Sequence, residues 1–153
     1  MRPINFISKI CICMLLVVLA GSPLYGKNDK INPREPGVYI KTDKSLTRLL
    51  PNMVFDEQGL LFIESNNPGR FFLKNIQYFI VFGKYDVDVL TFNPLLFLKP
   101  SPLGKPQFVF GKNTEIDVIS KGNDLYIVKP KALMARGYYC LWIEDTVWDF
   151  LIE

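Results

Sequence analysis

The stretch Gly137–Ile143, GYYCLWI, is followed by the turn EDT and by the last seven residues of the chain, VWDFLIE. Aromatic and β-branched residues dominate both stretches, which favours strands over helices. Because successive side chains of a strand leave opposite faces, Trp148 and Phe150 share one face and Asp149 lies on the other. The charge of Asp149 predicts that its face points to solvent and that the two rings point inward. We therefore expect a β-hairpin that covers an apolar core.

The same two-residue period continues through residues 37–153, with turn signals at intervals of about eight to twelve residues. It predicts an all-β fold: a single β-sandwich of Greek-key, immunoglobulin-like type with about nine short strands. Four prolines within 93–106 predict a loop or an edge there. Residues 131–136 are the one candidate for a helical turn. Strands are expected in a hairpin at 37–51 and at 60–65, 71–83, 86–92, 107–111, 114–120, 125–130, 137–143 and 147–153.

Residues 128–143, VKPKALMARGYYCLWI, combine a strand, a short corner, Gly137 and then Tyr138 on the next strand. This order resembles the tyrosine corner of immunoglobulin-like domains, in which the tyrosine hydroxyl bonds to backbone upstream. The resemblance implies that Tyr138 and Trp142 point inward and that Tyr139 points outward. The opposite register would expose Tyr138 and Trp142 as an aromatic platform for a sugar ring or a partner. The partner cysteine and the mid-domain tryptophan of the immunoglobulin pattern are absent.

A second resemblance joins the two ends of the domain. The front, EPGVYIKTDKSLTRLLP, and the back, ARGYYCLWIEDTVWDFLIE, are similar to a layout found in a group of exported bacterial proteins without an established activity. The resemblance implies export and β-structure and carries no activity with it.

The N-terminus has the three parts of a secretory signal peptide. Arg2 and Lys9 give a positive start, the eleven residues 10–20 form an apolar run, and small residues follow. A helix of that length rises about 16 Å, which is well short of the ~30 Å hydrocarbon core of a bilayer. We expect residues 1–20 to be a signal peptide, with cleavage as late as residue 26 as the alternative. Residues 21–36 are then a flexible leader, and no membrane span remains after cleavage.

The cysteines limit the covalent chemistry of the mature chain. Cys11 and Cys13 leave with the signal, so Cys140 remains without an internal disulfide partner. It is expected to be buried as a small apolar residue, and an intermolecular disulfide is the alternative. Ser22 stands where a bacterial lipobox has its lipidated cysteine, so the product is expected to be unlipidated and either periplasmic or secreted.

The charge pattern argues against several classes of partner. Without residues 1–20 the chain keeps 16 of its 18 basic residues and all 15 acidic residues, so its net charge is close to zero. The basic residues are spread singly. Neither nucleic acid nor an anionic membrane has a basic patch to bind. The chain has no histidine, which removes Ser-His-Asp and Cys-His catalysis and the common zinc sites. We expect no enzyme, no cofactor and no metal.

Paired carboxylates are the remaining route to chemistry. A spacing of two residues on a strand puts both acids on one face, where they could hold Ca²⁺ or act as acid and base. Exposed faces of half-buried strands are the simpler explanation. Asp86 with Asp88 and Glu115 with Asp117 have this spacing. For the enzyme alternative the acid pair is Asp86 with Asp88 or Asp145 with Asp149.

The stretch 75–82, NIQYFIVF, is apolar on both faces. Either it is a central strand covered twice, or another protein covers one face. The expected function is that of a non-enzymatic binding or structural module of the cell envelope or of a secreted assembly, through a protein partner or self-association. Carbohydrate binding through exposed aromatic rings and carboxylate-dependent hydrolysis are the alternatives. The candidate contact residues are Tyr78, Phe79, Phe82, Tyr138 and Trp142.

Overall fold

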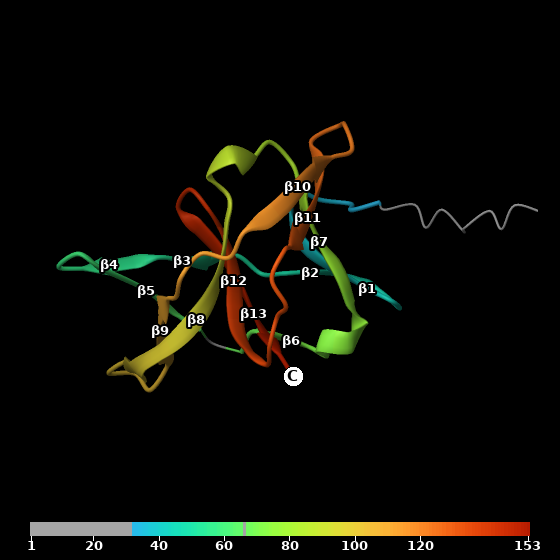
Figure 1. Cartoon of the computed structure of the whole chain (residues 1–153). Helices are drawn as coiled ribbons and strands as arrows, with labels where there is room; N and C mark the ends of the chain where they lie inside the picture. The colour runs from blue at the N-terminus through green and yellow to red at the C-terminus, as the bar shows by residue number, and fades with distance from the viewer. Residues whose placement is uncertain (1–31, 66) are drawn as a thin grey trace, which may run out of the picture. The chain divides into compact units, whose positions relative to one another are not determined.

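The computed structural model describes residues 32–65 and 67–153, of which Pro33–Glu153 form one compact unit. The predicted signal peptide and most of the leader lie outside the described residues. The described part holds thirteen strands, two 3₁₀ turns and no α-helix (Figure 1). The all-β prediction is confirmed, but the strands are more numerous and shorter than predicted. No helix in residues 32–65 and 67–153 has the length and hydropathy to cross a membrane.

One sheet has five antiparallel strands in the order β10-β11-β7-β1-β2; we call it sheet A. Its hairpin β1–β2 turns at Asp43–Ser45, as predicted, and the Thr42 hydroxyl accepts a hydrogen bond from the Ser45 N–H at 3.0 Å. The stretch 75–82, which is apolar on both faces, supplies the central strand. The strands are β1 (Gly37–Thr42), β2 (Leu46–Arg48), β7 (Ile76–Phe82), β10 (Ile116–Ser120) and β11 (Leu125–Pro130).

The other sheet, sheet B, follows the order β3-β13-β12-β8-β9-β5-β4, and β6 pairs with β13 in parallel. Its two end strands β3 and β4 are consecutive in the chain and are separated by Val54 alone. The chain therefore joins both ends of the sheet, which curls until it is nearly a barrel. The strands are β3 (Asn52–Met53), β4 (Phe55–Glu57), β5 (Leu60–Glu64), β6 (Gly69–Phe71), β8 (Thr91–Pro100), β9 (Pro106–Phe110), β12 (Gly137–Ile143) and β13 (Thr146–Ile152).

The main core lies between sheet A and the part of sheet B formed by β12, β13 and the start of β8. Phe79 of sheet A meets Phe92 and Phe150 of sheet B, with ring centroids 5.3 and 5.2 Å apart. All three rings are fully buried. The other core members, all with less than a tenth of their surface exposed, are Val38, Ile40, Leu49, Val81, Leu90, Val128, Leu141, Ile143, Trp148 and Ile152.

A second core fills the inside of the curled sheet B. Ile63, Leu95, Phe108, Cys140 and Val147 pack there from five different strands. Both faces of β12 and β13 are therefore buried, one in each core. The prediction that the Asp149 face of β13 points to solvent is wrong, because that face lines the inside of the curl and Asp149 is only 8 % exposed. Trp148 and Phe150 do point into the main core, as predicted.

The proline-rich segment 93–106 was predicted as a loop or an edge, and that prediction is wrong. It contains most of β8, which lies between β12 and β9. Pro94 cannot donate a ladder hydrogen bond, but its carbonyl accepts from the Gly111 N–H at 2.7 Å. The Gly111 carbonyl accepts instead from the side-chain Nδ2 of Asn93 at 3.0 Å. The amide of Asn93 thus replaces the missing donor and keeps the ladder intact.

Two further local predictions are corrected. Residues 86–92 were expected as one strand, but Val87–Val89 form a 3₁₀ turn that Asp86 caps by accepting a hydrogen bond from the Asp88 N–H at 3.1 Å. Residues 131–136 form bends and contain no helical turn. In the first segment the local hydrogen bond of a polar side chain favours a turn over a strand.

Candidate functional site

The predicted contact residues of the central strand β7 do not share one face. Phe79 points into the main core and is 0 % exposed, so its prediction as a contact residue is wrong. Tyr78 and Phe82 lie on the opposite face and are half-buried. Ile80, between them, is also 0 % exposed. Of the two explanations for this apolar stretch, the central strand covered on both sides fits Ile80 within a single chain.

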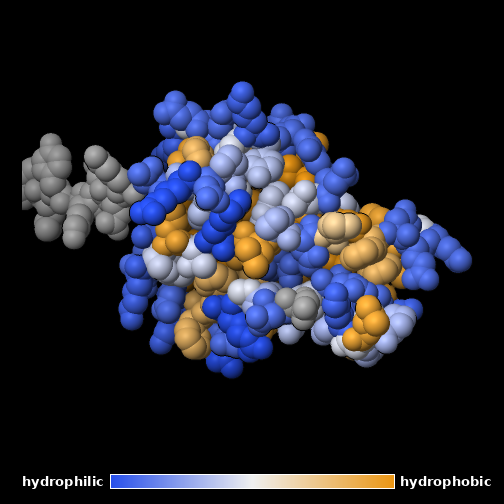
Figure 2. All heavy atoms as spheres, turned by 180° about the vertical axis from the view of Figure 1, so that it is seen from behind, coloured by the Kyte–Doolittle hydropathy of each residue, from blue (hydrophilic) through white to orange (hydrophobic). Residues whose placement is uncertain are grey.

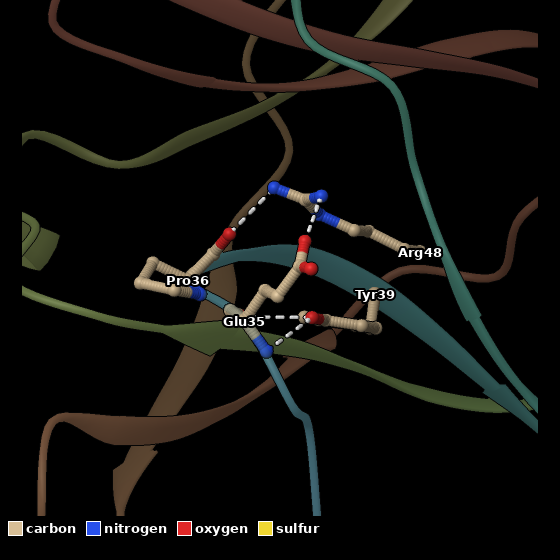
Figure 3. A network of polar contacts seen from close by, with 4 residues as sticks. All are labelled: Glu35, Pro36, Tyr39 and Arg48. Atoms are coloured by element: carbon tan, nitrogen blue, oxygen red, sulfur yellow. Dashed lines mark hydrogen bonds and ion pairs between the residues drawn. The ribbon is translucent and has the colours of Figure 1, made fainter.

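The segment before β1 contributes to that cover (Figure 3). The Tyr39 hydroxyl, on the same face as Ile80, donates to the Glu35 carbonyl. Arg48 Nη1 meets the Glu35 carboxylate at 2.6 Å, and its Nη2 donates to the Pro36 carbonyl at 2.8 Å. These bonds hold Glu35 and Pro36 against β1 and β2.

Tyr138 and Trp142 point into the curl of sheet B and are half-buried there. Tyr138 packs on Phe108 and Trp142 stacks on Phe110, each with ring centroids 4.5 Å apart. Trp142 Nε1 donates to the Glu144 carbonyl at 2.6 Å. The rim of the indole still borders a shallow pocket of about 310 Å³. The inward direction predicted for both residues agrees with these contacts.

The corner hydrogen bond belongs to a different tyrosine from the predicted one. The Tyr139 hydroxyl accepts from the Ala135 N–H at 3.1 Å, which ties the corner before β12 to the strand. Tyr139 packs on Phe92 and Phe150 of the main core. The expectation that Tyr139 points outward is therefore wrong. Since both faces of β12 are buried, alternation alone could not choose between the two tyrosines.

Sheet B has one outer surface that faces neither core. The register pairs Leu96 with Val109, Val109 with Phe62, and Phe62 with Phe55, so these side chains form one row across β8, β9, β5 and β4. Leu60 lies beside this row, two residues before Phe62. We call Phe55, Leu60, Phe62, Leu96 and Val109 the open face.

The open face is an exposed apolar surface. Leu96 is 56 %, Leu60 46 % and Phe55 38 % exposed. Phe62 is buried because Phe55 stacks on it with ring centroids 5.5 Å apart. Eight of the fourteen exposed large hydrophobic residues of the described chain lie in 53–61 and 96–103, in and beside these strands. Figure 2 shows hydrophobic atoms gathered toward the end of the molecule where β4 and β5 lie. Such concentrations mark contact surfaces more often than scattered single residues do.

Charged residues of opposite sign stand at two corners of the open face. Glu57 follows Phe55 by two residues on β4, and Lys99 of β8 pairs in register with Gln107, the neighbour of Glu64. Both Glu57 and Lys99 are exposed. Within residues 32–65 and 67–153 neither forms an ion pair.

A pocket of about 440 Å³ with a mixed polar and apolar lining lies beside β2, β3 and the end of β5. At its floor, Asp149 accepts hydrogen bonds from Asn52 Nδ2 at 3.1 Å and from Ser65 Oγ at 2.5 Å. Glu64 also lines it and accepts from Gln107 Nε2 at 3.2 Å. Two cations border the pocket: Lys105, 4.0 Å from the Glu64 carboxylate, and Arg48.

Cys140 is buried at the centre of the second core, next to Asp149 in register. Burial raises the pKa of its thiol, the Asp149 carboxylate raises it further, and a backbone hydrogen bond from Asn93 opposes them. A thiol of this kind stays protonated and unreactive. The burial predicted for Cys140 is confirmed.

The predicted acid pairs have structural roles or lie apart. Asp86 caps the turn that contains Asp88. Glu115 and Asp117 both approach Lys131 Nζ, at 3.7 and 3.6 Å. Asp145 is exposed in the turn before β13, whereas Asp149 is buried. Among the described residues no group of three or more histidine, cysteine or acidic side chains is placed to hold a metal ion.

Comparisons with known proteins return no match to this chain: no family model, no characterised protein and no solved structure is similar to it.

Sequence reasoning missed the open face and the Asp149 cluster. The signal for the open face was present in LLFIE and PQFVF, where neighbouring residues are all apolar or nearly so. Such runs are expected for strands with one face in a core and the other against a partner. Nothing local marks Asp149, because its partners Asn52 and Ser65 are 97 and 84 residues away.

Proposed function

We propose that this chain is an exported, non-enzymatic binding module that acts through the open face of sheet B. The observation that carries the proposal is the cross-strand row of Leu96, Val109, Phe62 and Phe55 on a sheet surface that belongs to neither core. A module that works by contact needs an apolar centre and a polar border, and the open face has both.

Export is inferred from the N-terminal residues of the sequence. A signal peptide at 1–20 and no lipidated cysteine at Ser22 give a periplasmic or secreted product. The immunoglobulin-like relationship is part of the same proposal. It rests on the order of strand, corner and strand in 128–143, where Tyr139 in place of Tyr138 forms the corner hydrogen bond. A sheet face as a contact surface agrees with the lack of histidine in the chain, since contact needs no group that titrates near neutral pH.

The experiment is site-specific photo-cross-linking in the native cells. A photoreactive residue replaces Val109 at the centre of the open face or, as a matched control, Leu133, which is 102 % exposed in the connection between β11 and β12. We expect a discrete cross-linked product from position 109 and none from position 133. Leu96→Lys should abolish that product, whereas Leu133→Lys should leave it. Equal products from positions 109 and 133, or none from 109, would contradict the proposal.

One observation favours a second candidate, a carboxylate-dependent hydrolase. Glu64 and Asp149 line the same pocket of about 440 Å³. Two carboxyl groups in one cleft are the minimum for glycoside hydrolysis. Turnover of a panel of chromogenic glycosides by the native chain, lost in Glu64→Gln, would support this candidate over the contact module. Loss of the cross-link without any turnover would support the module.

A further inference from the structure

We propose that the partner of the open face is a second copy of the same chain, in a two-fold symmetric, face-to-face dimer. This inference rests on the proposed contact function of that face and names its occupant. The charges at the border of the face, and the symmetry that they allow, point to this occupant.

Glu57 and Lys99 occupy diagonally opposite corners of the open face. In the register, the row Leu96, Val109, Phe62 and Phe55 lies in the middle. Glu57 is displaced from this row toward the β4–β5 turn, at the outermost strand of the face. Lys99 is displaced in the other direction along the strands, on the strand at the opposite border. The apolar row therefore lies between one acidic and one basic corner.

A two-fold axis in the plane of contact, perpendicular to this diagonal, places Glu57 of one copy opposite Lys99 of the other, and the reverse. The same operation lays the apolar rows of the two copies across one another. A single symmetry operation thus satisfies both corners, as an isologous interface requires. The strands of the two copies would cross at a steep angle, and orthogonal crossing is one of the two common ways in which sheets pack.

The two charges are available for this pairing. Both side chains are exposed, and in the described part of the chain neither has an ion-pair partner. The other lysine near this face, Lys105, already approaches Glu64 at 4.0 Å. Asp56, beside Glu57, accepts the Gly59 N–H at 2.8 Å within its own turn. Glu57 and Lys99 are therefore two charges at the border of this face without an ion-pair partner among the described residues, and they fix the orientation of a second copy.

The dimer should be weak. The open face is only four strands wide, so we expect it to bury less than the about 800 Å² per partner that is typical of stable complexes. A dimer of this size dissociates on dilution. The test therefore needs a concentration series and not a single concentration.

The experiment is sedimentation velocity on the protein purified from the compartment to which its cells deliver it, over concentrations from low micromolar to millimolar. We expect a reversible monomer–dimer equilibrium. Leu96→Lys should raise the dissociation constant of the dimer at least about tenfold, because it removes an apolar side chain from the row and places a charge in the interface. Glu57→Lys and Lys99→Glu should each weaken the dimer several-fold, since exposed ion pairs contribute modestly.

The decisive variant combines Glu57→Lys with Lys99→Glu, which restores opposite charges across the two-fold axis. We expect the dissociation constant of its dimer to be within about twofold of that of the native dimer. This change is smaller than the one expected when a single exposed ion pair is lost. The matched controls are Asp145→Lys and Lys121→Glu, which make the same charge changes in exposed turns outside the face; they should leave the equilibrium unchanged. Far-ultraviolet circular dichroism checks that every variant keeps its strands.

The sedimentation results can contradict the proposed dimer in three separate ways. A native chain that stays monomeric at every concentration overturns the second copy as the partner. A dimer that Leu96→Lys does not weaken overturns the face. A double variant as weak as the single ones overturns the pairing of Glu57 with Lys99. If the chain is monomeric but position 109 still cross-links to another protein in cells, the contact function stands and only the second copy fails.

Discussion

The carboxylate of Asp149 accepts a hydrogen bond from the hydroxyl of Ser65 at 2.5 Å, across 84 positions of the sequence. Its other oxygen accepts from Asn52 Nδ2 at 3.1 Å. Asn52 lies on β3 and Ser65 directly follows β5, so one side chain of β13 binds the two segments that bring the edges of sheet B together. The hydrogen bonds of Asp149 therefore stabilise the curled shape of sheet B.

Replacement of Asp149 should cost more than replacement of an exposed acid. Asp149→Ala leaves the buried Ser65 hydroxyl without an acceptor, and we expect the free energy of unfolding to fall by about 2–4 kcal/mol. Urea denaturation measures the change, with Asp145→Ala as control, which should stay within about 0.5 kcal/mol of the native chain. A double-mutant cycle with Ser65→Ala should show a coupling of at least about 0.5 kcal/mol. Strict additivity would mean that the two residues do not act together.

The two adjacent tyrosines of β12 should respond differently to loss of their hydroxyl groups. Tyr139→Phe removes the acceptor of the Ala135 N–H and should destabilise the chain by about 0.5–1.5 kcal/mol. Tyr138→Phe should be nearly neutral, because no hydrogen bond of its hydroxyl exists among the described residues. Thermal and urea unfolding of the two variants test this directly. A larger effect at Tyr138 would restore the corner that the sequence predicted.

The Cys140 thiol should make stability fall at alkaline pH. Its pKa is raised by burial in the folded chain, whereas the unfolded chain has an ordinary thiol pKa near ~8.5. Above that pH the unfolded state loses a proton that the folded state keeps. This contribution to stability is complete below pH ~8.5 and then declines by up to about 1.4 kcal/mol per pH unit.

The measurement is urea unfolding of the native chain and of Cys140→Ala from neutral pH to pH ~10, a range that spans the ordinary thiol pKa. The difference in free energy between the two chains isolates the thiol, because lysines and tyrosines titrate in both. The difference in free energy of unfolding between the native chain and Cys140→Ala should become smaller as the pH rises. In addition, a thiol reagent should label Cys140 only after denaturant is added. Rapid labelling of the native chain at neutral pH would disagree with the burial of Cys140.

Trp142 tests carbohydrate binding through aromatic rings. Trp148 is 3 % exposed, so a surface ligand can change the fluorescence of Trp142 without contacting Trp148. We expect no response to a broad panel of oligosaccharides, because Phe110 covers one face of the indole and its Nε1–H is already bonded to Glu144. Trp142→Phe serves as the control for the origin of any signal. Saturable quenching that this variant loses would favour sugar binding over the contact module.

Most strands could be predicted from the two-residue period, but their faces could not. The pattern located β1, β2, β5, β9, β10, β11, β12 and β13 to within a few residues. It failed at Pro94, where a side-chain amide replaces a backbone donor, and at β3 and β4, which are too short to show a period. It also failed at Asp149, since a charge predicts solvent only while no distant side chain offers it hydrogen bonds.

The sequence predicted that a contact surface would consist of exposed apolar residues on a sheet, but it did not predict which residues form the open face. Exposed aromatic and apolar residues on a sheet were expected to form a contact surface, and Phe79 was among them. Its burial follows from the position of β7 in the middle of sheet A, which cannot be read from the strand itself. The open face instead combines residues of four strands, each of which looks ordinary alone.

The sequence by itself determined the all-β class and several of the turns between strands, because these depend on residue type and on spacing along the chain. Only the tertiary structure decided which face of each strand is buried, which tyrosine closes the corner, and where apolar side chains remain exposed. The physical reason is the curl of sheet B. It places both faces of β12 and β13 in cores and leaves the outer side of β4, β5, β9 and β8 uncovered, through pairings between strands that no local pattern encodes.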